Sequence, residues 1–413
     1  MKNLQGATLI AALATAFSAQ AQTVMTINGL ETSTTCTAPL VFISDVGREG
    51  LFYPVASSST DQANGGTTLF CNKSNSGARK MYKRMFDGAV NAKWFGLSES
   101  SLDNAPAVQS AINALRNGQE VLIPEGYYKF QDTITLPDNK FIRFTARGDL
   151  AFGARDGIVV QGRYGHVLEL SKLHGTAWEN TPAYGYAGSG ITLMNAQYST
   201  VKVNWIDGFH NAIKLSGQGL NGSQYNKIDF ELLTHNDVGV LLTTENDGQK
   251  NWVNENSFTG GRMIGVTGLS AVAGSGQTDP FNGNKFYNFG FEGLTNGVDV
   301  DKFTSNIFIA PRLIGVEGVV NGFKFGPNAS DNVIIATGLY EEAFVSKGTA
   351  GNAGVRTLLL GRVLVKDGVT SGVVSISDSN GRFLSLIRDP SYTVSQQTKS
   401  RILPLSSLPA VSP

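Results

Sequence analysis

Cysteine, net charge and long apolar runs are all scarce in this chain of 413 residues. The two cysteines, Cys36 and Cys71, have no nearby histidine, which argues against a zinc site; they either pair in an oxidising compartment or stay as free buried thiols. The 33 basic and 33 acidic side chains balance, so no overall positive charge is available to capture nucleic acid. No segment reaches the roughly 18 apolar residues of a membrane-spanning helix, so we expect no membrane partner.

Motifs that identify several enzyme classes are also missing. The sequence has no nucleophile elbow, phosphate-binding loop, zinc-ligand spacing or dinucleotide-binding fingerprint. Its Gly-x-Gly segments, such as Gly188-Ser189-Gly190, lack the strand-to-helix context of a nucleotide site. Any chemistry must therefore come from side chains that the fold brings together.

The first 22 residues are typical of a secretory signal. Lys2 supplies the positive start, a short apolar run covers residues 9–17, and Ala19 and Ala21 are small residues at the cleavage positions. A buried N-terminal helix is the alternative interpretation. A cleaved signal would place the mature protein in the periplasm or outside the cell.

Glycine is abundant, with 48 residues, and it accompanies a repeat in the middle of the chain. Each copy is an Asn, a variable residue and a bulky apolar residue, and successive copies start 28, 22 and 26 residues apart. Repeats of this length are typical of a chain coiled into stacked turns. We expect the apolar residue to face the core and the Asn to form a hydrogen-bonded turn ladder. The copies begin at Asn256, Asn284, Asn306 and Asn332.

Short β-rich runs separated by Gly and Asn predict strands on both sides of this repeat. No helical patterns alternate with them, which argues against a doubly wound sheet. One helix is expected near residues 105–115, where apolar residues recur at helical spacing between Asp103-Asn104 and Asn117-Gly118. The expected strands lie near residues 40–43, 67–70, 120–123, 127–130, 133–137, 141–144, 157–160, 200–203, 238–242, 319–325, 358–365 and 372–376.

These patterns divide the chain into four parts. A signal peptide covers residues 1–22, and a polar, turn-rich leader covers residues 23–90. A solenoid covers residues 91–390, with its first helix near 105–115 and strands after residue 355 that close its C-terminal end. Residues 391–413 form a C-terminal extension.

The start of the predicted solenoid resembles a known family. Residues 91–96 (Asn-Ala-Lys-Trp-Phe-Gly), the helix at 105–115 and residues 121–128 (Val-Leu-Ile-Pro-Glu-Gly-Tyr-Tyr) are similar to the opening of the pectate-lyase-like superfamily and of phage tailspike-like depolymerases. The resemblance covers roughly residues 45–345 and implies an all-β, right-handed parallel β-helix with an N-terminal capping helix. One departure is that residues 97–104 replace the family's acidic Gly-Asp-Gly-x-x-Asp-Asp run.

A parallel β-helix brings equivalent positions of neighbouring turns to about 4.8 Å from each other. When the turns are aligned on the repeated Asn, two Arg fall six residues on, and Glu292 and Tyr340 fall eight residues on. His210 and His235 lie 25 residues apart, about one turn. We predict that these residues meet on one face. The predicted catalytic residues are Arg262, Arg312, His235, His210, Glu292 and Tyr340, and the predicted substrate-binding residues are Glu317, Glu341, Lys214, Trp252 and Tyr186.

These residue types fit two ways of cleaving a sugar polymer. A lyase needs a cation, such as Arg262 or Arg312, to neutralise a uronate and a base to remove the C5 proton. A hydrolase needs two carboxyl groups about 5 to 10 Å apart, such as Glu292 with Glu317 or Glu341. A structural salt-bridge ladder is the alternative for any Arg–Glu pair, and a structural role is the alternative for each His.

Two further acidic pairs are candidate Ca²⁺ ligands, because each puts two carboxylates on one face of a strand. The pairs are Asp229 with Glu231 and Asp299 with Asp301. A solvated strand face is the alternative explanation.

The leading functional prediction is a secreted or periplasmic polysaccharide lyase that acts on a polymer containing uronic acid. It depends mainly on the family resemblance, which is an analogy at the level of the fold. A glycoside hydrolase and a non-catalytic polysaccharide-binding adhesin are the alternatives. Tailspike-like relatives form trimers, but nothing in these residues demands one.

Overall fold

The computed structural model describes residues 23–56, 58, 62–176, 185–292, 294–314, 321–326, 328–336, 345–347 and 358–361. The predicted signal peptide and C-terminal extension lie outside these residues, as does the strand expected near 372–376. The chain forms two compact units, residues 1–98 with 106–115 and residues 99–105 with 116–413. None of the described helices is long and apolar enough to span a bilayer.

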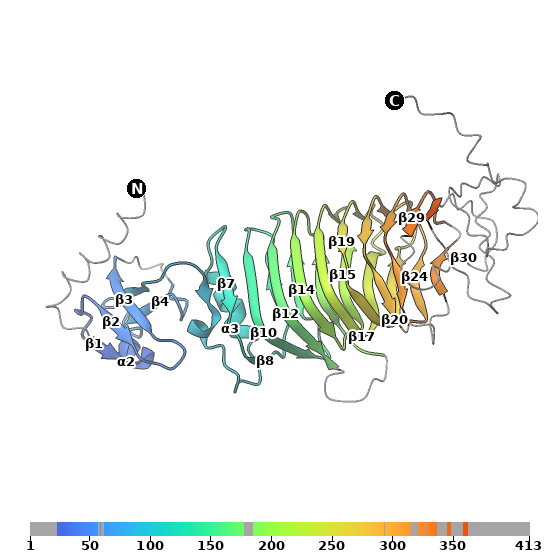
Figure 1. The fold of residues 1–413 in the computed structure, drawn as a ribbon. Coiled ribbons are helices and arrows are strands. Elements are labelled where there is room, and N and C mark those ends of the chain that lie inside the picture. The colour runs from blue at the N-terminus through green and yellow to red at the C-terminus, as the bar shows by residue number, and fades with distance from the viewer. Residues whose placement is uncertain are drawn as a thin grey trace, which may run out of the picture. The chain divides into compact units, whose positions relative to one another are not determined.

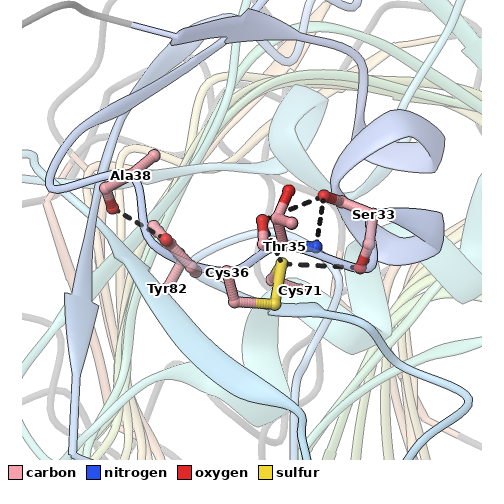
Figure 2. The surroundings of a disulfide bond; sticks show 6 residues. All are labelled: Ser33, Thr35, Cys36, Ala38, Cys71 and Tyr82. Carbon is pink, nitrogen blue, oxygen red and sulfur yellow. Dashed lines mark hydrogen bonds between the residues drawn. A yellow bond between two sulfur atoms is a disulfide. The ribbon is translucent and has the colours of Figure 1, made fainter.

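The first unit contains a small five-stranded sheet with the strand order β1-β2-β3-β5-β4. Its buried core includes Phe52 and Tyr82, and the Tyr82 hydroxyl donates to the carbonyl of Ala38 (2.7 Å). A disulfide joins Cys36 to Cys71 (Figure 2). The elements are β1 (Thr23–Met25), α2 (Ile27–Thr32), β2 (Val41–Ile43), β3 (Gly50–Val55), β4 (Thr68–Cys71), β5 (Lys80–Arg84), β6 (Val90–Asn91) and the 3₁₀ helix η1 (Ala92–Phe95).

The predicted helix near residues 105–115 is confirmed as α3 (Ala105–Ala114). The Asp103 carboxylate accepts from the backbone N–H of Ala105 (3.0 Å), which satisfies one of the free donors at the start of the helix. Val108, Ala111 and Ile112 are fully buried, as their helical spacing predicts.

The second unit is a solenoid of parallel strands that follow one another in chain order (Figure 1). Each turn contributes one segment to each of three sheets, which we call the first, second and third sheets. Within a sheet every segment pairs in parallel with its neighbours; Val121, Phe144 and Leu168, for example, are successive partners in the first sheet. The predicted all-β parallel β-helix is confirmed.

The strands divide among the sheets as follows. The first sheet contains β7 (Glu120–Ile123), β19 (Ser257–Thr259), β22 (Lys285–Tyr287), β26 (Ile307–Ile309), β29 (Val333–Ala336), β31 (Leu358–Gly361) and the starts of β10 (Arg143–Gly153), β12 (Val167–Gly175), β14 (Thr200–Asp207) and β17 (Lys227–Thr244). The second contains β8 (Tyr127–Lys129), β23 (Gly290–Glu292), β27 (Arg312–Ile314), the later parts of β10, β12 and β14, the middle of β17 and the start of β20 (Arg262–Val272). The third contains β9 (Ile134–Leu136), β11 (Ile158–Gln161), β13 (Ser189–Met194), β15 (Asn211–Gly217), β24 (Asn296–Val300), β28 (Asn321–Phe325), β30 (Val345–Lys347) and the ends of β17 and β20. Two short pairs lie at the turns, β16 (Gly222–Gln224) with β18 (Trp252–Asn254) and β21 (Phe281–Asn282) with β25 (Phe303–Thr304).

The repeated Asn residues form a buried ladder at the corner before the first sheet. Each side-chain amide donates to the amide oxygen of the next Asn, for example Asn256 to Asn284 (3.1 Å) and Asn284 to Asn306 (3.1 Å). The same oxygen also accepts the backbone N–H of the donating Asn; for example, the Asn306 amide oxygen accepts the N–H of Asn284 (2.8 Å). The predicted turn ladder is confirmed, and it starts one turn earlier than the repeat, at Asn226. All five members are fully buried: Asn226, Asn256, Asn284, Asn306 and Asn332.

The apolar residue two positions after each of these Asn faces the core, as predicted. Phe258, Phe286 and Phe308 stack on one another with ring centroids 4.9 and 4.7 Å apart. Each ring is at most 1% exposed. The alternation of strand side chains therefore leaves the neighbouring positions to the outer surface, where a ligand can reach them.

Candidate active site

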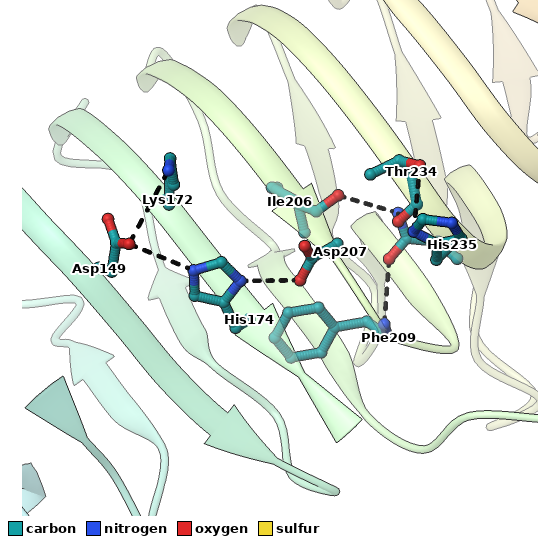
Figure 3. A network of polar contacts seen from close by, with 9 residues as sticks. Asp149, Lys172, His174, Ile206, Asp207, Phe209, Thr234 and His235 are labelled. Carbon is teal, nitrogen blue, oxygen red and sulfur yellow. Dashed lines mark hydrogen bonds and ion pairs between the residues drawn. The ribbon is translucent and has the colours of Figure 1, made fainter. Parts of the chain in front are cut away.

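The most unusual polar group of the β-helix is His174, at the end of β12 in the second sheet. Its side chain is completely buried, although it belongs to the outward-facing positions of the strand. His174 Nδ1 lies 2.9 Å from Asp207 Oδ1, and His174 Nε2 lies 3.6 Å from Asp149 Oδ2 (Figure 3). One imidazole therefore bridges two carboxylates from different turns.

The register of the second sheet explains how these three residues meet. His174 is the direct partner of Asp207 in β14, and Asp149 in β10 is the partner of Lys172, two residues before His174. Residues two apart on a strand face the same side, so all of these side chains share the outer face. The Asp149 side chain is 32% exposed and that of Asp207 is 6% exposed, so Asp149 is the carboxylate that solvent reaches.

A cation and two aromatic rings complete the cluster. Lys172 Nζ lies 3.9 Å from Asp149 Oδ2 and 4.9 Å from the centre of the Trp205 ring. Tyr127 is the partner of Asp149 in the preceding turn, and its ring centre lies 6.4 Å from that of His174. Among the described residues, the buried indole N–H of Trp205 has no hydrogen-bond partner, which leaves a donor for a ligand.

Glycine at the next position allows the chain to turn tightly behind the imidazole. A Cβ on Gly175 would lie 2.1 Å from the carbonyl oxygen of Gly208, so no other residue fits there without moving the backbone. Gly208 itself has a φ of 74°, in the left-handed region that favours glycine. His174 and Asp207 are thus each followed directly by a glycine, Gly175 at the end of β12 and Gly208 just after β14.

The arrangement suits acid–base chemistry. The backbones of Asp149 and Asp207 lie two turns apart, or about 10 Å along the axis of the β-helix, and their carboxyl groups are closer because His174 bridges them. Carboxyl groups that activate water on one side of a sugar and protonate the leaving oxygen on the other lie about 6.5 to 9.5 Å apart. His174 between them can hold or pass a proton, because both of its nitrogens face a carboxylate.

The residues predicted from the repeat lie further along the same sheet. Arg262 and Arg312 occupy equivalent positions, as predicted, with Gly290 between them. Glu292 aligns instead with Ile264, and its carboxylate accepts from Arg262 Nε (2.7 Å). This pair is the salt bridge that was the structural alternative. Tyr340, Glu317 and Glu341 lie outside the described residues.

His210 and His235 lie in successive turns, as predicted, but not at equivalent positions. His210 stacks instead on the turn of Asp237, and the carbonyl of His235 accepts the N–H of Gly208 (3.2 Å). The two positions are offset because turns differ in length, so a separation of 25 residues does not guarantee equivalent positions. His235 sits at a corner with a φ of 51°, where its Nδ1 lies 3.3 Å from the Thr234 hydroxyl.

A second polar group does bring two predicted residues together. His210 Nδ1 lies 2.8 Å from Asp237 Oδ2, which also accepts the backbone N–H of Tyr186 (3.0 Å). His210 is half exposed. Lys214 lies apart from them on the outer face of β15, and Trp252 lies in β18 at another corner. The predicted site residues that the structure describes are therefore spread over several faces and do not form one cluster.

Of the two acidic pairs considered for Ca²⁺, one has protein partners. Asp299 accepts from Lys324 Nζ (2.9 Å), and Asp301 accepts from the Asn328 backbone and side chain. Asp229 and Glu231 are exposed on either side of buried Phe230. Within the described part of the chain, no group of three or more His, Cys, Asp or Glu side chains is placed to hold a metal ion.

Sequence comparisons give no relative: no family model matches the chain, and no curated protein matches it. Solved structures do resemble it. Tailspike protein 2 of the Escherichia coli O157:H7 bacteriophage CAB120 is 13% identical, with a TM-score of 0.50 over 83% of this chain and 52% of that one. WceF of Pantoea stewartii, described as a glycan biofilm modifying enzyme with a tailspike-like parallel β-helix fold, is 14% identical, with a TM-score of 0.52 over 82% of this chain and 52% of its own.

These likenesses establish the fold, a right-handed parallel β-helix of the tailspike type. This chain spans about half the length of either structure. At such low identity the site must be argued from its own residues.

Proposed function

We propose that this protein is an enzyme that cleaves a polysaccharide, with Asp149, His174 and Asp207 as its acid–base centre. The observation that carries the proposal is the fully buried imidazole between two carboxylates on the outer face of the β-helix. Burying such groups costs free energy that apolar residues at the same positions would avoid. A cluster of ionisable groups that is costly to bury is a candidate functional site.

The three groups differ in their access to a substrate, which suggests their roles. Asp149 is open to solvent and next to Lys172, so it is the carboxyl group expected at the scissile bond. Asp207 holds His174 through Nδ1 and fixes the ring so that Nε2 faces Asp149. Lys172 and the ring of Trp205, 4.9 Å apart on the same outer face, are the groups next to Asp149 that would contact the sugar.

Hydrolysis is the reaction that the carboxylate spacing supports best. One carboxyl group protonates the glycosidic oxygen as the C1–O bond breaks, and the other removes a proton from the water that adds to C1. Because one imidazole contacts both groups, 2.9 Å from Asp207 Oδ1 and 3.6 Å from Asp149 Oδ2, these oxygens are at most about 9 Å apart, a distance that fits an inverting enzyme. The fold of a glycan-modifying enzyme is consistent with this class of substrate.

Elimination from a uronic acid, the leading prediction from the sequence, is the second candidate. The observation that favours it is Lys172, a cation next to Asp149 that can neutralise a sugar carboxylate while Asp149 removes the C5 proton. The two Arg predicted for this purpose lie on later turns of the same sheet, and Arg262 is bound to Glu292.

One experiment separates the candidates. The purified protein is incubated with acidic polymers (polygalacturonate, alginate) and neutral polymers (amylose, galactomannan), and new reducing ends and absorbance near 235 nm are followed together. Reducing ends without absorbance support hydrolysis, and both signals together support elimination. Binding without either signal would leave a non-catalytic adhesin and contradict the proposal.

We further propose that the protein works outside the cytoplasm. The Cys36–Cys71 disulfide is typical of an oxidising compartment, and the first 22 residues have the pattern of a secretory signal. Fractionation of cells that produce the full chain, followed by mass measurement of the mature N-terminus, tests this; an intact protein in the cytosol would contradict it.

A further inference from the structure

Exposed tyrosines gather on one edge of the β-helix, at the corner between the third and first sheets. Tyr164, Tyr198 and Tyr225 are 50%, 59% and 44% exposed, and they belong to three successive turns. They are the exposed aromatic rings that the structure describes in the second unit. Scattered surface tyrosines need no explanation, but three in a row on one edge do.

Two of these rings stack, and one outer face of the stack is uncovered. The Tyr198 and Tyr225 rings have centroids 5.4 Å apart and planes 13° from parallel. In the preceding turn, the residue at the position of Tyr198 is Gly165, where a Cβ would lie 3.4 Å from the Tyr198 Cβ. Because glycine has no side chain, the residue at this position of the preceding turn does not cover the ring of Tyr198.

A polar cavity lies at the same edge and is lined by Tyr164, the residue before Gly165. It has a volume of about 570 Å³, within the range of ligand pockets. Gln197, the residue before Tyr198, binds two residues of the cavity wall. Its backbone N–H donates to the carbonyl of Gly162 (3.0 Å), and its side-chain amide donates to Asn221 (3.3 Å). The cavity is lined by amide and charged side chains together with one aromatic ring, including Asp138, Arg163, Tyr164, Asn195, Gln218 and Asn221.

We propose that this edge, made of Tyr164, Tyr198, Tyr225 and the adjoining cavity and here called the tyrosine edge, is a second glycan-binding site. Aromatic rings beside paired donors and acceptors fit a pyranose ring, which has apolar C–H faces and a rim of hydroxyl groups. A second protein copy would need a broader apolar surface than three rings separated by polar side chains. The inference rests on the proposed function, because the same polymer would be held here and cleaved at Asp149.

The two sites lie on different parts of the β-helix. Asp149, His174 and Asp207 belong to the second sheet, whereas the tyrosine edge follows the third. A long polymer can contact both, and a short oligosaccharide can occupy only one. The tyrosine edge would therefore affect the affinity for polymer and leave the cleavage of short fragments unchanged.

The test uses the full chain with Asp149→Asn, so that the polymer survives the measurement. Affinity for polygalacturonate, alginate, amylose and galactomannan is measured by affinity electrophoresis, with and without Tyr198→Asn and Tyr225→Asn. Asn is chosen because both positions have φ near 60°, which Asn tolerates. We expect the double substitution to weaken polymer binding about tenfold, equivalent to about 1.4 kcal/mol.

A second variant blocks the uncovered ring without removing any tyrosine. Gly165→Asn places a side chain against Tyr198 at a φ of 66°, and we expect a similar loss of affinity. Tyr53→Ala, which removes an exposed ring in the first unit, is the matched control and should leave binding unchanged. Thermal unfolding checks that each variant is folded.

The outcomes separate this proposal from the proposed function. In the background with Asp149 intact, the tyrosine variants should cleave short oligosaccharides at the parent rate, whereas Asp149→Asn should stop cleavage and keep polymer affinity. Unchanged polymer affinity in the tyrosine variants would overturn the second site, as would a parent protein that binds no polymer of the panel. A parent dimer or trimer in sedimentation that dissociates on Tyr198→Asn would assign the edge to self-association instead.

Discussion

The two halves of the β-helix place different chemistry at equivalent positions. From β19 to β29 the core is a stack of phenylalanines, the corner is a ladder of asparagines, and the outer second sheet carries the solvent-exposed Arg262–Glu292 pair. From β10 to β14 the corner holds His166 and Ser199 instead of Asn, and the outer second sheet carries the buried His174. The regular half is scaffold, and the irregular half holds the candidate site.

Energetic reasoning supports this division. An ion pair that is half exposed contributes little to stability, so the C-terminal pair needs no function to explain it. A buried imidazole between carboxylates is costly, so it persists only where something else is gained. Substitutions in the two halves should therefore have different effects.

The largest effect is expected at His174. His174→Gln keeps a polar side chain but cannot exchange a proton, so cleavage should fall about 100- to 10,000-fold, the usual contribution of acid–base catalysis. The rate is measured as reducing ends across pH 4 to 9, and any remaining activity should lose the parent pH dependence. Arg262→Gln, on the same sheet in the other half, is the control; equal losses in both would show that the halves do not differ.

The next effect concerns the stability of the regular half. Phe286→Ala removes a ring that is stacked between Phe258 and Phe308, and the unfolding free energy should fall by about 3 to 5 kcal/mol. Tyr287→Ala, one residue further and facing outward, should cost much less. Denaturant unfolding measures both, and similar losses would contradict the assignment of core and surface.

The Asn ladder should contribute less than the ring stack. Asn284→Ala leaves the Asn256 amide and backbone N–H without their acceptor, which should cost about 1 to 3 kcal/mol in unfolding free energy. Asn282→Ala removes an amide that only donates to the Asp279 carbonyl near the surface, and it serves as the control. A ladder variant as stable as this control would mean that the repeated Asn is not a structural residue.

The smallest effect is a pH dependence at His166. Burial lowers the pKa of His166, whose Nδ1 accepts the backbone N–H of Ile142 (3.3 Å) and must be unprotonated to do so. The unfolded chain therefore binds the proton at a higher pH than the folded one, so stability is complete above about pH 6.5 and is lost as the pH falls through the lowered pKa.

His166→Asn should remove part of this acid sensitivity, because Asn is the residue that later turns use at the same corner. Melting temperatures of the parent and the variant between pH 4.5 and 8 measure the effect. A parallel pH dependence in the two proteins would show that His166 is not responsible.

Much of the fold could be predicted from the sequence. The expected strands near residues 40–43, 67–70, 120–123, 200–203 and 238–242 correspond to β2, β4, β7, β14 and β17, and the Asn repeat predicted the stacked turns and their buried ladder. Local alternation and turn residues fix these features, so they are visible in a single sequence. The strand expected near 372–376 and the C-terminal extension lie outside the described residues.

The candidate site was missed for a physical reason. The alignment began at Asn256, whereas the corner ladder continues backward through residues that are not all Asn, to His166 and Ser199. Counting eight residues on from these two leads to His174 and Asp207, the same step that led to Glu292 in the regular half. Asp207 also lies 33 residues after His174, so a constant spacing could not reveal the pair.

A comparison of cleavage rates shows whether the active site lies at Asp149 or in the other half of the β-helix. The parent, Asp149→Asn and Glu292→Gln are assayed on the polymer that the parent cleaves. Asp149→Asn is predicted to fall about 100-fold or more, and Glu292→Gln to stay within about threefold of the parent. Full activity in Asp149→Asn together with a large loss in Glu292→Gln would place the chemistry in the other half of the β-helix and contradict the account.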